Sequence, residues 1–198
     1  MQKINWQDRP ELFTGTVSPL QRMSKELLDF YTYNDAATIR AACPSAVAMQ
    51  FKSNTTRLQI VMQFGGAARE IFTTDIFVNG QLTTLEGDGV HDLTLESGEK
   101  DIVIQFPHLV VVKNLEISVD DATWIQPLAA AEKLVLCGDS ILQGMTCSSP
   151  SKALGVIAAA QLGLAPHNIA VGGAIMQPLP VADPKASGGT GTWSTVKF

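Results

Sequence analysis

Residues 137–144 read CGDSILQG, and they place Ser140 directly after the apolar run Leu134–Cys137. In a parallel sheet, ligands bind at the carboxyl ends of the strands, so a serine there can present its hydroxyl to a substrate. The pair Gly172-Gly173 follows a second apolar run, Asn168–Val171. If the two runs are neighbouring strands, a glycine N–H and the Ser140 N–H can both stabilise a developing oxyanion. The simpler interpretation of Ser140 is a turn serine that caps a helix.

These residues resemble the SGNH, or GDSL-type, family of ester hydrolases. The resemblance covers residues 134–177 and rests on Gly138-Asp139-Ser140-Ile141 with Gln143-Gly144, followed by Asn168-x-x-x-Gly172-Gly173. It implies that Ser140 is the nucleophile of a covalent acyl-enzyme and that the amides of Ser140 and Gly173 are oxyanion-hole donors. Gly138, Asp139 and Gly172 would support the two turns. The family also implies a small acyl ester or an acetylated carbohydrate as substrate, with neither a metal nor an organic cofactor.

The histidine that should serve Ser140 as a base is not identifiable in the sequence. The family pattern supplies an Asp-x-x-His near the C-terminus and a central Gly-x-Asn-Asp, and neither follows Ser140. One Asp-x-x-His match, Asp88-Gly89-Val90-His91, precedes Ser140 within a Gly-Asp-Gly turn, and turn chemistry accounts for it. We expect His108 to be a loop histidine. We expect His167 to precede the second parallel strand, with its ring directed away from Ser140.

Two hypotheses follow from the missing base. In the first, the chain is the N-terminal part of an ester hydrolase whose hydrolase domain, residues 129–198, is truncated. It then hydrolyses p-nitrophenyl acetate no faster than its Ser140→Ala variant. In the second, the chain is a non-catalytic β-sandwich module for binding or assembly with a vestigial hydrolase segment. Because a truncated unit exposes sheet edges and apolar helix faces, we expect either self-association or disorder after about residue 178.

Residues 12–126 carry the alternation of apolar and polar side chains that is typical of half-buried strands. Asn79-Gly80 between two apolar pairs predicts a tight hairpin, because both residues tolerate positive φ. Strands that recur about every ten residues between such turns favour an antiparallel β-sandwich or jelly roll, which we assign to residues 1–128. The predicted strands are Ala46–Phe51, Arg57–Phe64, Ile71–Val78, Val90–Leu95, Lys100–Phe106 and Leu109–Val119.

After Pro127 the pattern changes to that of a parallel sheet. The two apolar runs at residues 134–137 and 168–171 predict buried strands with a helix between them, which by resemblance is the first βαβ unit of a flavodoxin-like SGNH domain. The fold class is therefore an α+β chain of two parts, 1–128 and 129–198, whose tail (178–198) is predicted to be loop or disordered. The predicted helix spans Ser148–Leu164, with Ser151 as its N-cap and Gly163 and Pro166 as its stop.

The composition indicates a globular chain that binds neither nucleic acid nor a membrane. Of 198 residues, 45% are hydrophobic and 17% are charged, the net charge is −5, and no Lys/Arg cluster is present to attract nucleic acid. No apolar stretch approaches the roughly 20 residues of a membrane-spanning helix, and the polar start lacks a signal-peptide core. Three cysteines at irregular spacing fit a reducing compartment, so we expect a cytoplasmic location and no metal site.

Two other residue types have simple explanations. Cys137, close to Ser140, is expected to be a buried residue at a strand end rather than a second nucleophile. Trp6 and Trp124 are assigned to core packing rather than to stacking on sugar rings, because aromatic residues make up 7% of the chain and form no cluster. Trp193 lies in the tail and receives no assignment.

Overall fold

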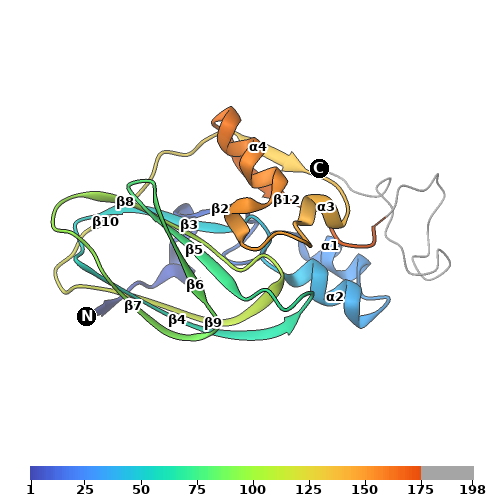
Figure 1. Cartoon of the computed structure of the whole chain (residues 1–198), viewed down its shortest axis with the longest axis horizontal. Helices are drawn as coiled ribbons and strands as arrows, with labels where there is room; N and C mark the ends of the chain where they lie inside the picture. The colour runs from blue at the N-terminus through green and yellow to red at the C-terminus, as the bar shows by residue number, and fades with distance from the viewer. Residues whose placement is uncertain (175–198) are drawn as a thin grey trace.

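Two antiparallel β-sheets make up most of the computed structural model, which describes residues 1–174 (Figure 1). The tail predicted as loop or disordered, residues 178–198, and Trp193 within it lie outside the described residues. One sheet has the strand order β1 (Gln2–Lys3), β9 (Val110–Val119), β4 (Arg57–Ala67) and β7 (Gly89–Thr94). The other has the order β10 (Ile125–Pro127), β3 (Ala48–Ser53), β8 (Lys100–Gln105), β5 (Thr73–Val78) and β6 (Gln81–Glu86), and β2 (Phe13–Thr14) pairs with β3.

The two sheets share one hydrophobic core, and we call them together the two-sheet body. Alternate residues of β4, such as Leu58 and Ile60, are buried in the same cluster as Ile102 and Ile104 of β8. Period-2 alternation places these side chains on the inner faces, while their neighbours along each strand face outward. The predicted β-rich, mostly antiparallel character of this part of the chain is therefore confirmed.

The hairpin between β5 and β6 forms at the predicted residues. Val78 pairs with Gln81 across the turn, and the two turn residues have positive φ, 49° at Asn79 and 81° at Gly80. A two-residue turn with positive φ at both positions matches the twist of the flanking strands.

Two short helices lie within residues 12–126, the region whose sequence pattern indicated β structure in general. α1 (Lys25–Phe30) begins after Ser24, whose side chain accepts the Leu27 N–H, and α2 (Asp35–Ala42) begins after Asn34, whose side chain accepts the Ala37 N–H. Side-chain caps of this kind satisfy backbone donors that a first helical turn leaves free. The prediction of β structure from residue 12 onward is wrong for this segment, which lies at the right-hand end of the molecule in Figure 1.

The segment after β10 contains a parallel strand pair with helices between the strands. β11 and β12 pair in parallel with Leu136 opposite Asn168, as the sequence pattern predicted in outline. The second strand lies earlier than predicted, and residues 169–171 follow its end rather than forming it. The elements are β11 (Lys133–Leu136), α3 (Ser140–Gln143), a 3₁₀ turn (Pro150–Lys152), α4 (Leu154–Leu162) and β12 (Ala165–Asn168).

The helix between the two strands begins later than predicted. Ala153 is the N-cap of α4, so the prediction of Ser151 as the N-cap is wrong. Ser151 lies in the preceding 3₁₀ turn, where its N–H donates to the Asp75 carboxylate at 2.9 Å. The predicted stop at Gly163 is confirmed, since this residue takes the left-handed conformation that ends many helices (φ 68°). Pro166 lies within β12 and is not part of the stop.

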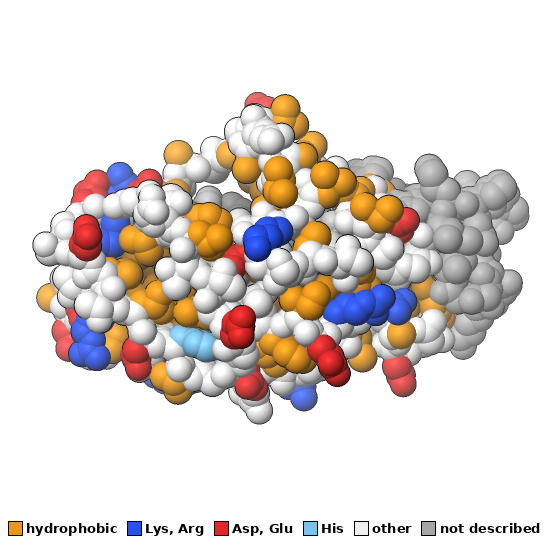
Figure 2. All heavy atoms as spheres, in the orientation of Figure 1, with side chains coloured by type: hydrophobic (Ala, Val, Ile, Leu, Met, Phe, Trp, Pro, Cys, Tyr) orange, Lys and Arg blue, Asp and Glu red, His pale blue; other side chains and the backbone are white. Residues whose placement is uncertain are grey.

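Apolar side chains of this segment face the surface. Val135 is 45% exposed, so the prediction of a fully buried first strand is wrong. A parallel strand is buried on both faces only when helices and further strands cover it, and β11 pairs with β12 alone among the described residues. Figure 2 shows apolar side chains gathered over α4. The exposed large apolar residues of α3 and α4 are Ile141, Leu154, Ile157 and Leu162.

Candidate active site

The turns that follow β11 and β12 lie side by side. Past the end of the paired strands, the Ile169 N–H donates to the Leu136 carbonyl at 2.9 Å, and the Val171 N–H donates to the Gly138 carbonyl at 3.2 Å. Ser140 and Gly173 each come two residues after this last bonded pair. The parallel register therefore brings the two turns to the same edge of the strand pair, where parallel sheets bind ligands.

Ser140 is the first residue of α3, a helix of one turn. Asp139 is the N-cap, and its Oδ1 accepts the Ile141 N–H at 2.9 Å. α3 ends at Gly144 with φ 83°. Ser140 is half-buried, and among residues 1–174 its hydroxyl has no hydrogen-bond partner. The Asp139 contact fits the supporting role that the resemblance implies for this residue.

Two buried amide side chains fix α3 against the end of β12. The Gly172 N–H donates to Gln143 Oε1 at 2.6 Å, and Gln143 Nε2 donates to the Arg40 carbonyl at 2.7 Å. Asn168 Nδ2 donates to the Leu142 carbonyl at 2.7 Å, while its Oδ1 accepts the Ala170 N–H at 2.9 Å. Buried amides that are fully bonded in this way hold one geometry, since any other arrangement leaves polar groups unpaired.

The structure favours glycine at both positions of the pair that follows β12. A Cβ on Gly172 would come within 2.5 Å of Met145 Cε, so a larger residue would require the end of this flexible side chain to move. Gly173 has φ 89°, a conformation that residues with a side chain rarely adopt. Because the Gly172 N–H is bonded to Gln143, the Gly173 N–H is the amide of this pair without a partner in the described part of the chain. Gly173 is also exposed, as an oxyanion donor must be.

A buried cation that the sequence analysis did not identify supports the end of β12 from below. The Arg22 side chain is fully buried, and its nitrogens donate to the carbonyls of Cys43, Asn168, Ala170 and Arg40 at 2.7–2.9 Å. Burial lowers the pKa of its guanidinium to about 10. No sequence signal marks this residue, since its partners come from segments far apart in the chain.

Arg40 places a second guanidinium against the glycine pair. Its Nη1 donates to the Gly172 carbonyl at 3.1 Å and lies 3.3 Å from the position that a Cβ of Gly173 would occupy. Within residues 1–174, Arg40 has no carboxylate at ion-pair distance. A half-exposed cation without an acidic partner gives this edge a positive potential that favours a developing negative charge.

None of the three histidines is bonded to Ser140. His108 lies in a loop, as predicted, but is buried, and its Nε2 lies 3.0 Å from the Gly144 carbonyl at the end of α3. Its Nδ1 has no partner among the described residues. His91 belongs to β7, and its Nε2 lies 3.2 Å from the carbonyl of Gly87 in the turn that precedes this strand. The interpretation of the Asp88–His91 match as turn chemistry is consistent with this contact.

The prediction that His167 precedes the second parallel strand is wrong. It lies within β12, and its Nε2 contacts the Arg22 carbonyl at 2.7 Å. The difference arises because β12 begins at Ala165, three residues before the predicted start. Burial lowers the pKa values of both His108 and His167.

Cys137, Trp6 and Trp124 are each partly buried. Cys137 is half-buried and packs against the cluster of α1 and α2, and burial raises the pKa of its thiol, which disfavours the nucleophilic thiolate. Trp6 packs against the core with its ring 5.9 Å from that of Phe13, in agreement with the predicted packing role. Trp124 is half-buried and is not part of that core cluster.

Comparison with solved structures identifies proteins of similar fold. A salicylyl-acyltransferase from a tetracycline biosynthetic pathway is 22% identical with a TM-score of 0.69, over 81% of this chain and 52% of that one. A GDSL-like lipase from Bacteroides ovatus is 19% identical with a TM-score of 0.67, over 83% and 55%. A carbohydrate esterase family 2 enzyme from Corynascus thermopiles is 18% identical with a TM-score of 0.51, over 70% and 49%.

The chain therefore shares the fold of these proteins over the aligned part, in agreement with the esterase-like fold that the resemblance predicted, and it spans about half the length of these structures. No protein-family model and no curated protein matches the sequence. In residues 1–174, no helix is long and apolar enough to cross a membrane, and no three side chains are grouped as metal ligands. The cytoplasmic location stays a prediction.

Proposed function

We propose that this chain carries the nucleophile part of a serine esterase or acyl-transfer site. The observation that carries the proposal is the placement of Ser140 and Gly173 two residues beyond the bonded pair Gly138 and Val171. We assign the site to a flavodoxin-like hydrolase segment, residues 129–198, which follows a jelly-roll domain at residues 1–128. The esterases and the acyltransferase with a similar fold support acyl chemistry in general.

In the proposed reaction, Ser140 Oγ attacks the carbonyl carbon of an ester. The amides of Ser140 and Gly173 hold the oxyanion of the tetrahedral intermediate, and each such donor contributes about 3–4 kcal/mol in known acyl transfer. The carbon–oxygen bond to the alcohol then breaks, which leaves an acyl group on Ser140. A base accepts the proton of Ser140 and passes it to the departing alcohol. Water or a second alcohol then takes up the acyl group and gives up a proton, which returns to Ser140 through the base. Gly138, Asp139 and Gly172 hold the two turns in place.

The proposed substrate is a small acyl ester or an acetylated carbohydrate. The supporting facts are the similarity to a carbohydrate esterase and the half-exposed Arg40 beside the glycine pair, which favours the anionic intermediate. We propose no metal or organic cofactor, because ester cleavage through an acyl-serine needs neither.

A second candidate function is a non-catalytic role in binding or assembly. It is favoured by the absence of any bond between Ser140 and a histidine in residues 1–174. Under this alternative the hydrolase segment is vestigial, and the apolar residues exposed on α4 take part in self-association.

Chemical rescue separates the two candidates. p-Nitrophenyl acetate is incubated with the chain and with its Ser140→Ala variant, with and without added imidazole as an external base. We expect acetylation of the peptide that contains Ser140, detected by mass spectrometry, in the presence of imidazole. We also expect p-nitrophenolate release above that of the variant, because imidazole can accept the proton that Ser140 loses.

Each outcome has a defined meaning. Acetylation of Ser140 without imidazole would show that a base is present in the chain and would contradict the expectation from the sequence. Equal rates for the chain and Ser140→Ala under both conditions, with no acetyl group on Ser140, would overturn the catalytic proposal and favour the binding role.

A further inference from the structure

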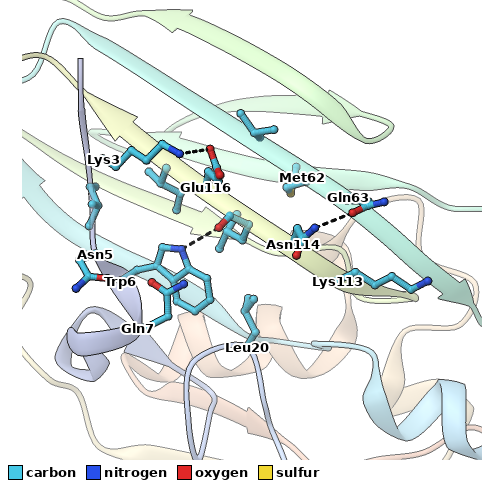
Figure 3. Close-up of a pocket in the computed structure, with 14 residues that line it drawn as sticks. Lys3, Asn5, Trp6, Gln7, Leu20, Met62, Gln63, Lys113, Asn114 and Glu116 are labelled. Carbon is cyan, nitrogen blue, oxygen red and sulfur yellow. Dashed lines mark hydrogen bonds and ion pairs between the residues drawn. The ribbon is translucent and has the colours of Figure 1, made fainter.

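A groove of about 740 Å³ lies at the side of the two-sheet body (Figure 3). It forms where residues 3–7 continue beyond β1 and run beside β9, and Leu20 lies at its rim. Its volume is within the range of small-molecule sites. Its lining comes from the N-terminal segment, Leu20, β4 and β9, and shares no residue with the turns that hold Ser140 and Gly173.

The polar side chains of the groove are mainly carboxamides. Gln63 and Asn114 lie on neighbouring strands, and Asn114 Nδ2 donates to Gln63 Oε1 at 2.7 Å. This bond uses the Asn114 nitrogen and the Gln63 oxygen. The Gln63 NH₂ group and the Asn114 side-chain oxygen therefore remain available to bond to a ligand. Asn5 and Gln7 add two exposed amides on the opposite side, although Asn5 Nδ2 already donates to the Asp8 carboxylate. Because each amide offers both a donor and an acceptor, the set matches hydroxyl groups, which also do both.

Trp6 supplies a fixed aromatic ring between these amides. Its Nε1–H donates to the Leu115 carbonyl at 3.0 Å, and Phe13 packs against it, so the ring is held in one orientation while remaining half-exposed. An aromatic face carries partial negative charge and attracts the polarised C–H groups on the face of a sugar ring. A fixed ring also costs little entropy when a ligand binds.

The charges of the groove favour a neutral ligand. Glu116 is paired with Lys3 at 2.7 Å, which removes most of its attraction for a cation. Lys113 has no ion-pair partner in the described part of the chain, but a single exposed lysine is a weak site for a phosphate or sulfate group. Aromatic, amide and apolar groups together fit a ligand with many hydroxyls and no net charge.

We propose that this groove binds a neutral oligosaccharide. One part of the Trp6 ring packs against the core, as predicted, while its exposed part stacks against one sugar unit. The amides of Gln63 and Asn114 bond to the hydroxyls of that sugar. The inference does not depend on the proposed function, because the groove lies apart from Ser140 and needs no catalysis. It makes the two-sheet body a recognition module with a binding site of its own.

Isothermal titration of the whole chain tests this proposal. The ligands are hexasaccharides of β-linked glucose, β-linked xylose and α-linked glucose. The informative variant is Gln63→Ala/Asn114→Ala, which removes two exposed amides without disturbing the core. The matched control is Gln59→Ala, which removes an amide from the same strand outside the groove. Ser140→Ala serves as a second control.

We expect saturable binding of at least one hexasaccharide. The affinity should fall by about tenfold or more in the double variant and should be unchanged in Gln59→Ala and Ser140→Ala. Absence of binding to every hexasaccharide would overturn the proposal, as would a double variant that binds like the unmodified chain. Loss of binding in Ser140→Ala would also overturn it, by moving the sugar to the candidate active site.

Discussion

The Gly172 N–H donates to the side-chain oxygen of Gln143 at 2.6 Å, and both residues are buried. Gln143 lies on α3, three residues after Ser140, and Gly172 directly precedes Gly173. This bond therefore links the helix that carries the candidate nucleophile to the turn that carries the candidate oxyanion donor. The other end of the amide donates to the Arg40 carbonyl, so the side chain has no freedom to rotate.

Replacing Gln143 with Ala should lower the free energy of unfolding by about 2 kcal/mol, because the Gly172 N–H would lose its buried partner. Urea denaturation measures the change. Gln161→Ala is the matched control, since Gln161 is exposed on α4 and should change stability by no more than about 0.5 kcal/mol. Equal stability of the two variants would show that water replaces the lost oxygen without cost.

Arg22→Lys should be strongly destabilising even though it keeps the positive charge. Lysine has one ammonium group in place of a planar fork, so it cannot reach four carbonyls that now bond to three guanidinium nitrogens. We expect a loss of about 3 kcal/mol or more in urea denaturation. Arg69→Lys is the control, because Arg69 is exposed and, within residues 1–174, its side chain bonds only to the neighbouring Ala68 carbonyl. A near-neutral Arg22→Lys would contradict the role assigned to the guanidinium.

Stability should decrease as the pH falls below about 6.5. Burial lowers the pKa values of His108 and His167 below their ordinary 6.5, so the unfolded chain binds protons that the folded chain does not. Their contribution is fully present above pH 6.5 and is lost as the pH falls toward the lower folded-state values, with a slope of at most about 1.4 kcal/mol per pH unit for each histidine.

The measurement compares urea denaturation at about pH 7.5 and about pH 5.5, above the range in which most carboxylates titrate. His108→Gln keeps a donor for the Gly144 carbonyl but cannot be protonated, so its stability should change less between the two values. A variant with the full pH dependence of the unmodified chain would exclude His108 as a source.

Arg40→Ala should slow the imidazole-dependent acetylation of Ser140 by about tenfold, since it removes the cation beside Gly172 and Gly173. Arg40→Lys should recover part of the rate by restoring the charge. Arg40→Ala should lower the free energy of unfolding by less than Arg22→Lys does. Arg40 is half-exposed, and water can bond to the Gly172 carbonyl in its place. An unchanged acetylation rate in Arg40→Ala would show that this charge does not act on the site.

Local patterns predicted the strands well because each one depends on its own residues. β4, β5 and β8 begin or end within two residues of the predicted bounds, and Asn79-Gly80 forms the expected turn. The short helices α1 and α2 were missed because neither is long enough to establish a helical period. Their caps, Ser24 and Asn34, were the available signal.

The candidate site was predictable only in part. The motif around Ser140 and the glycine pair identified the two turns, and the parallel pairing brings them together. Arg22 and Arg40 could not be predicted, because their partners at residues 168–172 are more than a hundred positions away in the chain. Such contacts depend on the packing of separate segments, which a one-dimensional pattern does not contain.

The bonds of Arg22 also determine the order in which the chain can fold. Its guanidinium joins the loop before α1 to carbonyls 146 and 148 residues later, so these contacts close a very long loop. Contacts between distant residues form slowly, because the chain loses the entropy of the intervening loop before the contact stabilises it. During synthesis, the ribosome must release residues 168–170 before Arg22 can bond to them. The turn that holds Gly173 is therefore expected to reach its final geometry after the local hairpins of the two-sheet body.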